Sequence, residues 1–288
     1  MGTMEAELKN WLKKRPYLGE IAGLHRIITA TVEQSAVSAT GNADPGEERT
    51  VKELEKGIPF LRAAQTDGGA VESAAGLFKE IIDALAAASL TEKIDDYARL
   101  MQRAFEKEPA LPEQIIAEVL EKNSVEGSKA ALEGIDEGFV IFAAWRALAR
   151  ALQPLQERVA ELLEKHLWRR GYCPVCGHLP AVGHLLHTEK GQGRERDLVC
   201  GCCQMKWRYK RIGCPYCGNS TQKQLKIIGL DDEPDLRIDT CDQCKSYLKT
   251  YTGEGNERIA LADWSTLHLD LIARKQGFKR AGYQMYGV

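Results

Sequence analysis

The chain has 288 residues, 44% of them apolar, with 39 basic and 41 acidic side chains. This length predicts two or three domains and provides enough apolar material for a sizeable core. The balanced charge gives no general attraction to nucleic acid or to an anionic membrane, and no window approaches the roughly 18 apolar residues of a membrane span. Because the first residues lack the apolar core of a secretory leader, we expect a cytoplasmic protein without membrane insertion.

Residues 1–170 have the pattern of an all-helical domain. Apolar residues at helical spacing predict a helix over about 17–37. Residues 38–48 are rich in small and turn-forming residues and predict a loop. Further helical runs follow at 50–57, 70–88, 91–107 and 112–122. We therefore expect a bundle of short antiparallel helices.

The last helical segment, residues 137–172, is long and leads directly into the cysteine-rich region. Pro154 lies inside it and should kink or divide the helix, because proline removes a backbone hydrogen bond and clashes with the preceding turn. Its apolar stripe from Leu152 to Leu163 covers barely two heptads, which indicates a core-facing helix rather than a coiled coil. We expect this segment to link the two halves of the chain.

All nine cysteines lie between Cys173 and Cys244, in a quarter of the chain. Eight of them form four Cys-x-x-Cys pairs, and 23 residues separate the two pairs of each copy, so the motif repeats with a period of 41. Both copies open with Cys-Pro-x-Cys-Gly, and an arginine, Arg196 or Arg237, precedes the third cysteine of each. The region is an internal duplication.

Two thiolates flanking a two-residue turn are typical zinc or iron ligands, and two such knuckles complete a tetrahedral four-sulfur site. A reducing cytosol and an odd number of thiols favour metal over disulfides. We predict two metal ions per chain, either iron of the rubredoxin type or zinc. The equal loops favour sequential pairing of the knuckles over a cross-braced arrangement. The predicted metal ligands are Cys173, Cys176, Cys200 and Cys203 at the first site, and Cys214, Cys217, Cys241 and Cys244 at the second.

The remaining thiol, Cys202, lies outside the repeat. We expect it to be a spectator in its knuckle, with a substitute ligand or a redox-active thiol as the alternatives. Three histidines, His178, His184 and His187, follow the first knuckle. Since four cysteines already fill the site, we expect these histidines at surface or hairpin positions.

A basic stretch with two interleaved aromatics, residues 206–211, joins the modules. Such a stretch is compatible with nucleic-acid binding, with binding of an acidic protein surface, or with a strand whose Trp207 and Tyr209 pack inward. Residues 212–249 have a balanced charge, so the basic character does not repeat with the cysteine motif. Nucleic acid is therefore a less favoured partner. No signature of a catalytic site is present, and we expect no enzyme activity.

These features predict a multidomain α+β protein. A helical bundle at 1–170 is followed by a rubredoxin-like or zinc-ribbon module at 171–211, and by a second such module with a C-terminal helix at 212–288. Each module is too small to bury an adequate core, so metal binding should supply much of its folding free energy.

The chain resembles the FdhE-type formate dehydrogenase accessory proteins. The matching features are the four knuckles with their neighbouring residues, and the C-terminal segment Leu261-Ala-Asp-Trp-Ser-Thr-Leu-His-Leu-Asp-Leu. They cover residues 171 to about 280. The N-terminal half matches in character, through its helices and the fragments Lys14-Arg-Pro-Tyr-Leu and Gly57-Ile-Pro-Phe-Leu.

This resemblance implies a cytoplasmic accessory protein, not an enzyme, that binds the catalytic subunit of a respiratory formate dehydrogenase during its maturation. It also implies that the same eight cysteines are the metal ligands. Cys202 is an additional cysteine that the family's simpler knuckle does not lead one to expect. Two other functions stay open from the residues alone, namely a rubredoxin-like electron carrier and a zinc-ribbon protein that binds nucleic acid.

Overall fold

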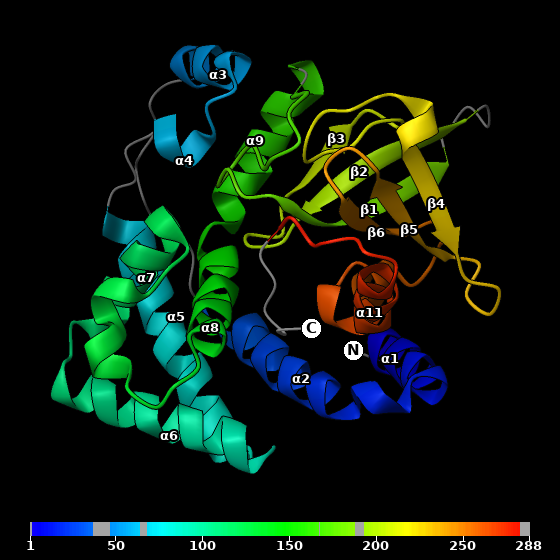
Figure 1. The fold of residues 1–288 in the computed structure, drawn as a ribbon. Coiled ribbons are helices and arrows are strands. Elements are labelled where there is room, and N and C mark those ends of the chain that lie inside the picture. Colours follow the sequence, from blue (N-terminus) through cyan, green and yellow to red (C-terminus); the bar gives the residue numbers. More distant parts are fainter. Residues whose placement is uncertain (1, 37–46, 64–67, 167, 188–192, 283–288) are drawn as a thin grey trace.

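The computed structural model describes residues 2–36, 47–63, 68–166, 168–187 and 193–282 (Figure 1). Helices come first: α1 (Gly2–Lys14), α2 (Gly19–Gln34), α3 (Glu47–Lys56), α4 (Phe60–Ala63), α5 (Gly68–Ala87), α6 (Glu92–Lys107), α7 (Leu111–Lys122), α8 (Glu137–Ala151) and α9 (Gln153–Lys165). The strands and last helices follow: β1 (Pro180–His187), β2 (Arg194–Cys200), β3 (Lys206–Tyr209), β4 (Leu225–Gly229), β5 (Leu236–Cys241), β6 (Ser246–Tyr251), α10 (Glu257–Ala260) and α11 (Leu267–Lys275). Short 3-10 helices are η1 (Pro16–Leu18), η2 (Glu126–Leu132), η3 (Gln222–Gln224) and η4 (Asp263–Thr266).

The predicted arrangement of a helical N-terminal region, a sheet-rich cysteine region and a C-terminal helix is confirmed. The expected loop at 38–48 lies almost entirely outside the described residues. Among the described residues, no helix is long and apolar enough to cross a membrane.

Helix α5 forms the centre of the helical half and packs against α2, α6, α7 and α8 (Figure 1). Its buried side chains recur at helical spacing and are fully inaccessible: Leu77, Phe78, Ile81, Ile82 and Leu85. Side-chain caps begin two of the surrounding helices, because the Thr91 hydroxyl accepts the Ile94 N–H and the Asp136 carboxylate accepts the Phe139 N–H.

The predicted division at Pro154 is confirmed. Helix α8 ends at Ala151, and α9 begins at Gln153 after the single residue Leu152, with Pro154 in its first turn, where the missing N–H costs no helical hydrogen bond. Helix α9 then runs beside the first cysteine module, where the Gln156 amide donates to the carbonyl of Cys203 at 2.8 Å. The segment thus connects the helical half to the sheet, as expected.

The six strands in the described part of the chain form one sheet in the order β3-β2-β1-β6-β5-β4. Within each copy of the repeat the strands are antiparallel neighbours, as a meander requires. The two copies join through β1 and β6, which are parallel, with Val182 opposite Lys249 and His184 opposite Tyr251. The modules are therefore two halves of one continuous sheet. The domain boundaries after residues 170 and 211 remain a prediction.

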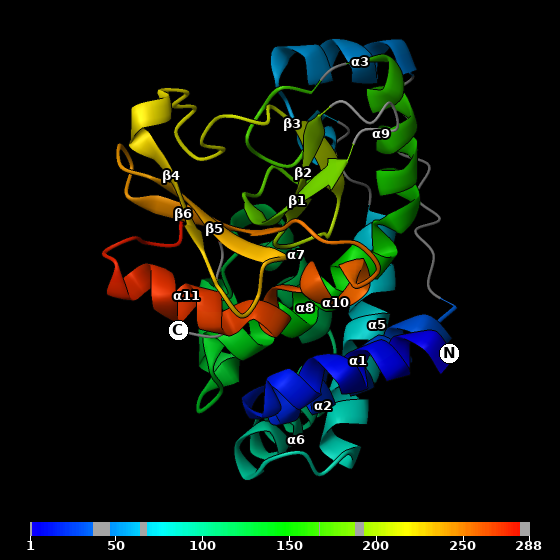
Figure 2. The same ribbon diagram turned by 90° about the vertical axis from the view of Figure 1, so that its right-hand side faces the viewer.

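Helices cover the two faces of this sheet unequally. One face packs against α1, η4 and α11 around a core that includes Trp11, Ile238, Tyr251 and Trp264 (Figure 2). On the other face, Leu198 and Trp207 of the first module belong to the same core as the helical half. The second module's part of that face is open, as described below.

A buried ionic network fastens the C-terminal segment to β6. Lys249 is 1% exposed, and its Nζ lies 2.7 Å from carboxylate oxygens of both Asp263 and Asp270. Arg280 forms ion pairs with the same two aspartates at 2.6 and 3.0 Å, and the Tyr247 hydroxyl donates to Asp270. Two cations and two anions balance, so this burial leaves no net charge.

Candidate metal centres

The first knuckle of each module is a tight turn closed by backbone hydrogen bonds. The Cys173 N–H donates to the His178 carbonyl at 2.8 Å, and the Gly177 N–H donates to the Cys173 carbonyl at 3.0 Å. Gly177 has a φ of +80°, a conformation that glycine adopts without strain. The same bonds recur 41 residues later at 2.8 and 3.0 Å among Cys214, Gly218 and Asn219.

The second knuckle of each module also turns through a left-handed residue, which here is not glycine. Gln204 follows Cys203 with a φ of +67°, and Lys245 follows Cys244 with a φ of +57°. These two positions are again 41 residues apart. The duplication that the sequence indicates therefore extends to the backbone conformation of every knuckle.

The structure brings the eight predicted cysteines together as two sequential quartets. The first quartet is Cys173, Cys176, Cys200 and Cys203, and the second is Cys214, Cys217, Cys241 and Cys244. Within each quartet all four Sγ atoms lie within 4.8 Å of one another, and all nine cysteines are free thiols. The expected sequential pairing thus agrees with the geometry, whereas a cross-braced pairing does not.

The spacing of the sulfur atoms fits a tetrahedral metal. Adjacent Sγ atoms are 3.5 Å apart in both contacts described for the first quartet, and 3.6 and 3.7 Å apart in the second. A tetrahedron with metal–sulfur bonds of about 2.3 Å has sulfur–sulfur edges of roughly 3.8 Å. The chemistry of the donor set, four thiols in a turn-supported cage, suits zinc or iron.

The first quartet is enclosed by the helical half. Its knuckle carbonyls, on Pro174 and Val175, accept the N–H groups of Phe60 and Leu61 at 2.8 and 3.0 Å. Burial raises the pKa of Cys173 well above its usual range, because an enclosed site disfavours the charged thiolate. This quartet lies at the junction between α4, α9 and the sheet.

The second quartet is closer to solvent. Cys217 is exposed and Cys244 is intermediate, whereas Cys214 and Cys241 are buried. Burial raises the pKa of Cys241, but hydrogen bonds from the Cys244 N–H and the Asn219 side chain outweigh it and lower the pKa to about 7. The two quartets therefore share one geometry but differ in access.

Each quartet has one polar neighbour next to a sulfur atom. The sequence analysis did not identify Asn219, and it expected His178 only at a surface or hairpin position. Asn219 Nδ2 donates to the Cys241 sulfur at 3.6 Å. Its repeat partner, His178, lies beside Cys176, although its Nδ1 has no hydrogen-bond partner among the described residues. Burial lowers the pKa of His178, but its interaction with Cys176 outweighs burial, so the pKa is raised above its usual value. Their shared position, two residues after a knuckle, was the signal that could have revealed them.

The other histidines and Cys202 lie outside the quartets. His184 is buried on β1 and stacks on Tyr251 at 5.5 Å, while His187 ends that strand. Cys202 is 2% exposed, and its N–H donates to the sulfur of Cys200 at 3.4 Å. Its backbone thus supports a quartet sulfur, whereas its own thiol lies outside the four-sulfur group.

The basic stretch between the modules is mostly strand β3, with alternating burial. Trp207 and Tyr209 point inward and are 3% and 7% exposed, which leaves no aromatic surface on which bases could stack. Arg208 points outward and pairs with Glu195 and Asp197 of β2. The inward-packing alternative is therefore confirmed for this stretch.

A cleft of about 700 Å³ lies where the helical half, the first module and the C-terminal segment meet. Helix α2 contributes Ala30, α8 contributes Trp145, and the knuckle of the first quartet contributes Cys202. Trp264 of the C-terminal segment completes the wall and stacks on His25 at 5.0 Å. Charged side chains of both signs line the cleft together with aromatic ones, a composition suited to a protein surface.

Comparison with known proteins shows similarity to one family. Residues 212–286 match the family described as "FdhE, C-terminal domain". An FdhE homolog of Aquifex aeolicus is 35% identical over 131 residues, which are 44% of this chain and 46% of that protein. The FdhE protein of Escherichia coli is 35% identical over 116 residues, which are 39% of this chain and 36% of that protein. The aligned stretch thus spans less than half the length of these curated relatives.

The fold comparison covers nearly the whole chain. The crystal structure of the FdhE protein from Pseudomonas aeruginosa superposes with a TM-score of 0.63 and 25% sequence identity, over 97% of this chain and 92% of that one. The helical half, which the sequence related to the family only in character, is therefore included in the match. In its C-terminal region and its overall fold, the chain is therefore similar to FdhE proteins.

Proposed function

We propose that this protein is a cytoplasmic accessory factor for the maturation of a formate dehydrogenase. The FdhE likeness carries this proposal, because it extends over both the C-terminal domain and the fold. The protein acts by binding the immature catalytic subunit rather than by catalysing a reaction.

The eight quartet cysteines are proposed as ligands of two metal ions. The support is the spacing of their Sγ atoms and the hydrogen-bonded turns that hold them. When bound, zinc or iron would cross-link the two knuckles of each module and supply much of the free energy that orders them. The first quartet then also fixes the sheet against the helical half, since its knuckle accepts the N–H groups that begin α4.

The cleft beside the first quartet is the proposed contact for the catalytic subunit. Its walls come from three separate parts of the chain, so the cleft exists only when the metal-stabilised module is docked on the helices. Aromatic side chains such as Trp145 and Trp264 supply the apolar area from which interface affinity usually comes.

The test uses a substitution that obstructs the cleft and changes no cysteine. Ala30 is exposed on α2 and lines the cleft, so Ala30→Arg should obstruct it while leaving the fold intact. Ala87→Arg, at an exposed position on α5 outside the cleft, is the matched control. We expect Ala30→Arg to weaken binding of the immature catalytic subunit by at least about tenfold. Equal affinity of the two variants would exclude this cleft as the contact.

A rubredoxin-like electron carrier is the second candidate, and the exposure of Cys217 favours it. A metal centre near solvent exchanges electrons with a partner more readily than one that is enclosed. This function requires iron, because zinc has no redox chemistry. Reversible bleaching of the visible spectrum on reduction supports it, and a zinc-only protein excludes it.

A further inference from the structure

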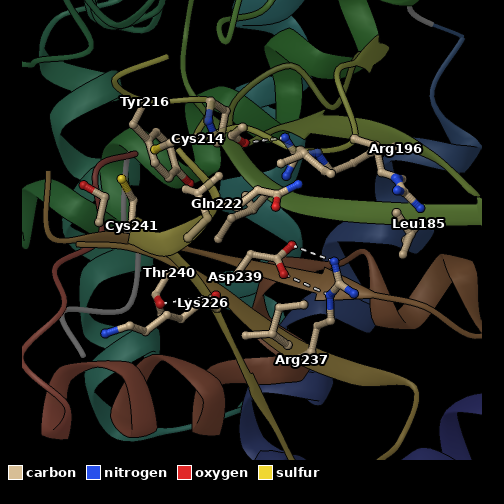
Figure 3. A pocket seen from close by; sticks show the side chains of 18 residues that line it. Leu185, Arg196, Cys214, Tyr216, Gln222, Lys226, Arg237, Asp239, Thr240 and Cys241 are labelled. Carbon is tan, nitrogen blue, oxygen red and sulfur yellow. Dashed lines mark hydrogen bonds and ion pairs between the residues drawn. The ribbon is translucent and has the colours of Figure 1, made fainter. Parts of the chain in front are cut away.

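A second pocket, of about 320 Å³, lies on the open part of the sheet next to the second quartet (Figure 3). Its walls come from β2, β1, β6, β5 and β4, and from the segment that joins the two modules. Apolar side chains form much of the lining, including Leu185, Leu248 and the exposed Ile227. The volume is that of a small-molecule site, and the cleft proposed for the catalytic subunit is a separate cavity.

The main polar group of this pocket is the guanidinium of Arg196. The residue is only 3% exposed, and its Nη2 donates to the carbonyls of Lys210 and Gly213 at 2.8 and 2.6 Å. Figure 3 shows the side chain reaching across the pocket to the backbone beside Cys214. None of the described carboxylates forms an ion pair with Arg196, and its Nε has no hydrogen-bond partner. A buried charge of this kind is costly unless an anion compensates it.

The repeat provides an internal comparison for this arginine. Arg237 occupies the equivalent position in the second module and lies on the opposite wall of the same pocket (Figure 3). Its charge is neutralised, because its Nε lies 2.9 Å from the Asp239 carboxylate. Asp239 therefore forms an ion pair with Arg237, whereas its charge reaches Arg196 without an ion pair.

A third arginine adds to the excess of positive charge. Arg211 is exposed, lines the pocket, and has no ion pair among the described residues. Arg196, Arg211 and Arg237 thus face one carboxylate, that of Asp239. Lys226 lines the pocket too, but its ammonium pairs with Asp242 and points away from the cavity in Figure 3.

We propose that this pocket binds a dianionic oxyanion of the phosphate class, with Arg196 at its floor and Arg211 at its rim. A guanidinium presents N–H donors in a fork that matches phosphate oxygens. Two guanidinium groups without an ion pair to a described residue, Arg196 and Arg211, offer more N–H donors than a single carboxylate can accept, which suits the several oxygens of a phosphoryl group. Leu185, Ile227 and Leu248 leave room for an apolar body attached to the phosphoryl group.

The experiment measures binding to the whole purified protein by calorimetry at low salt, with inorganic phosphate and phenyl phosphate as probes. We expect wild-type protein to bind at millimolar or lower concentration. Arg211→Gln should weaken binding by about tenfold with unchanged metal content, because Arg211 is exposed and its replacement leaves the quartet intact. Arg208→Gln is the matched control, since Arg208 is an exposed arginine of β3 outside the pocket.

The two probes distinguish the sources of the phosphate group. Tighter binding of phenyl phosphate indicates a phosphoryl group carried on a larger apolar ligand, and equal binding indicates a free oxyanion. The proposal would be overturned by no binding of either probe, or by equal affinity of Arg211→Gln and Arg208→Gln. A loss confined to variants that also lose metal would overturn it as well, because it would assign the arginines to the quartet.

Discussion

Replacing Asp270 with asparagine is expected to destabilise the protein more than any exposed charge replacement. Asp270 is fully buried and accepts three hydrogen bonds, from the Tyr247 hydroxyl at 2.6 Å, Lys249 Nζ at 2.7 Å and Arg280 Nη1 at 3.0 Å. The substitution leaves two buried cations facing only Asp263. One positive charge is then uncompensated in the interior.

Removing one partner of a buried ion pair costs about 3–5 kcal/mol. The matched control is Asp96→Asn, which breaks an exposed pair with Arg99 and should cost less than about 1 kcal/mol. The free energy of unfolding is measured for both variants by urea titration followed by tryptophan fluorescence. Trp264 lies in the core that covers this face of the sheet and reports on its loss.

A double variant tests whether charge is the cause. Lys249→Met combined with Asp270→Asn removes one cation and one anion, so it should cost less than the sum of the two single substitutions. If Asp270→Asn lowers the free energy of unfolding no more than Asp96→Asn does, the buried network does not stabilise the C-terminal segment. Exact additivity in the double variant would equally refute the electrostatic reasoning.

Three further predictions concern other parts of the sheet. A chelator should remove metal from the second quartet before the first, because Cys217 is exposed; release of two equivalents at one rate would contradict this. Gly171→Ala should disrupt the junction of the two modules, because an added Cβ would lie 1.7 Å from the Pro215 carbonyl oxygen; an unchanged melting temperature would disprove that close packing. Burial raises the pKa of Asp263, but Arg280 and Lys249 outweigh it and lower the pKa from 3.8 to about 2. The unfolded state therefore binds its proton first, and about 2 kcal/mol of stability, complete above about pH 5, should disappear as the pH falls toward 2. Urea titrations of Asp263→Asn should lack this part of the acid dependence, and an unchanged dependence would contradict the assignment.

Spacing alone predicted the two quartets, because a Cys-x-x-Cys knuckle fixes its own local turn. Pro154 likewise marked the break between α8 and α9, since its effect on a helix depends on neighbouring residues only. The structure shows the two groups of four cysteines and the break at Pro154. The turn of each knuckle and the break are set by neighbouring residues, whereas the meeting of two knuckles about 24 to 30 residues apart was inferred from the equal spacing of the repeat.

The joining of the modules could not be predicted in this way. Strands β1 and β6 pair in parallel across more than 60 residues, and side-chain alternation does not reveal which strand lies next to which. Strand β6 is also buried at all six positions, because cores cover it on both faces, so it has no alternating pattern. Buried Lys249 follows from this location, which only the tertiary structure reveals.

The N-terminal helix presented the same difficulty. Trp11 of α1 packs on the sheet, and its Nε1–H donates to the carbonyl of Ser265, 254 residues away. Amphipathic periodicity shows that a helix buries one face, but it does not identify the partner. Both pockets depend on such long-range contacts, and neither was visible in the sequence.

The most direct test of the central claim is the affinity of the immature formate dehydrogenase catalytic subunit for this protein before and after its metal is removed. Metal content is determined by elemental analysis on the same samples. The account predicts about two metal ions per chain in the binding-competent protein, and loss of binding when they are stripped. Undiminished binding by the metal-free protein would contradict a metal-stabilised platform.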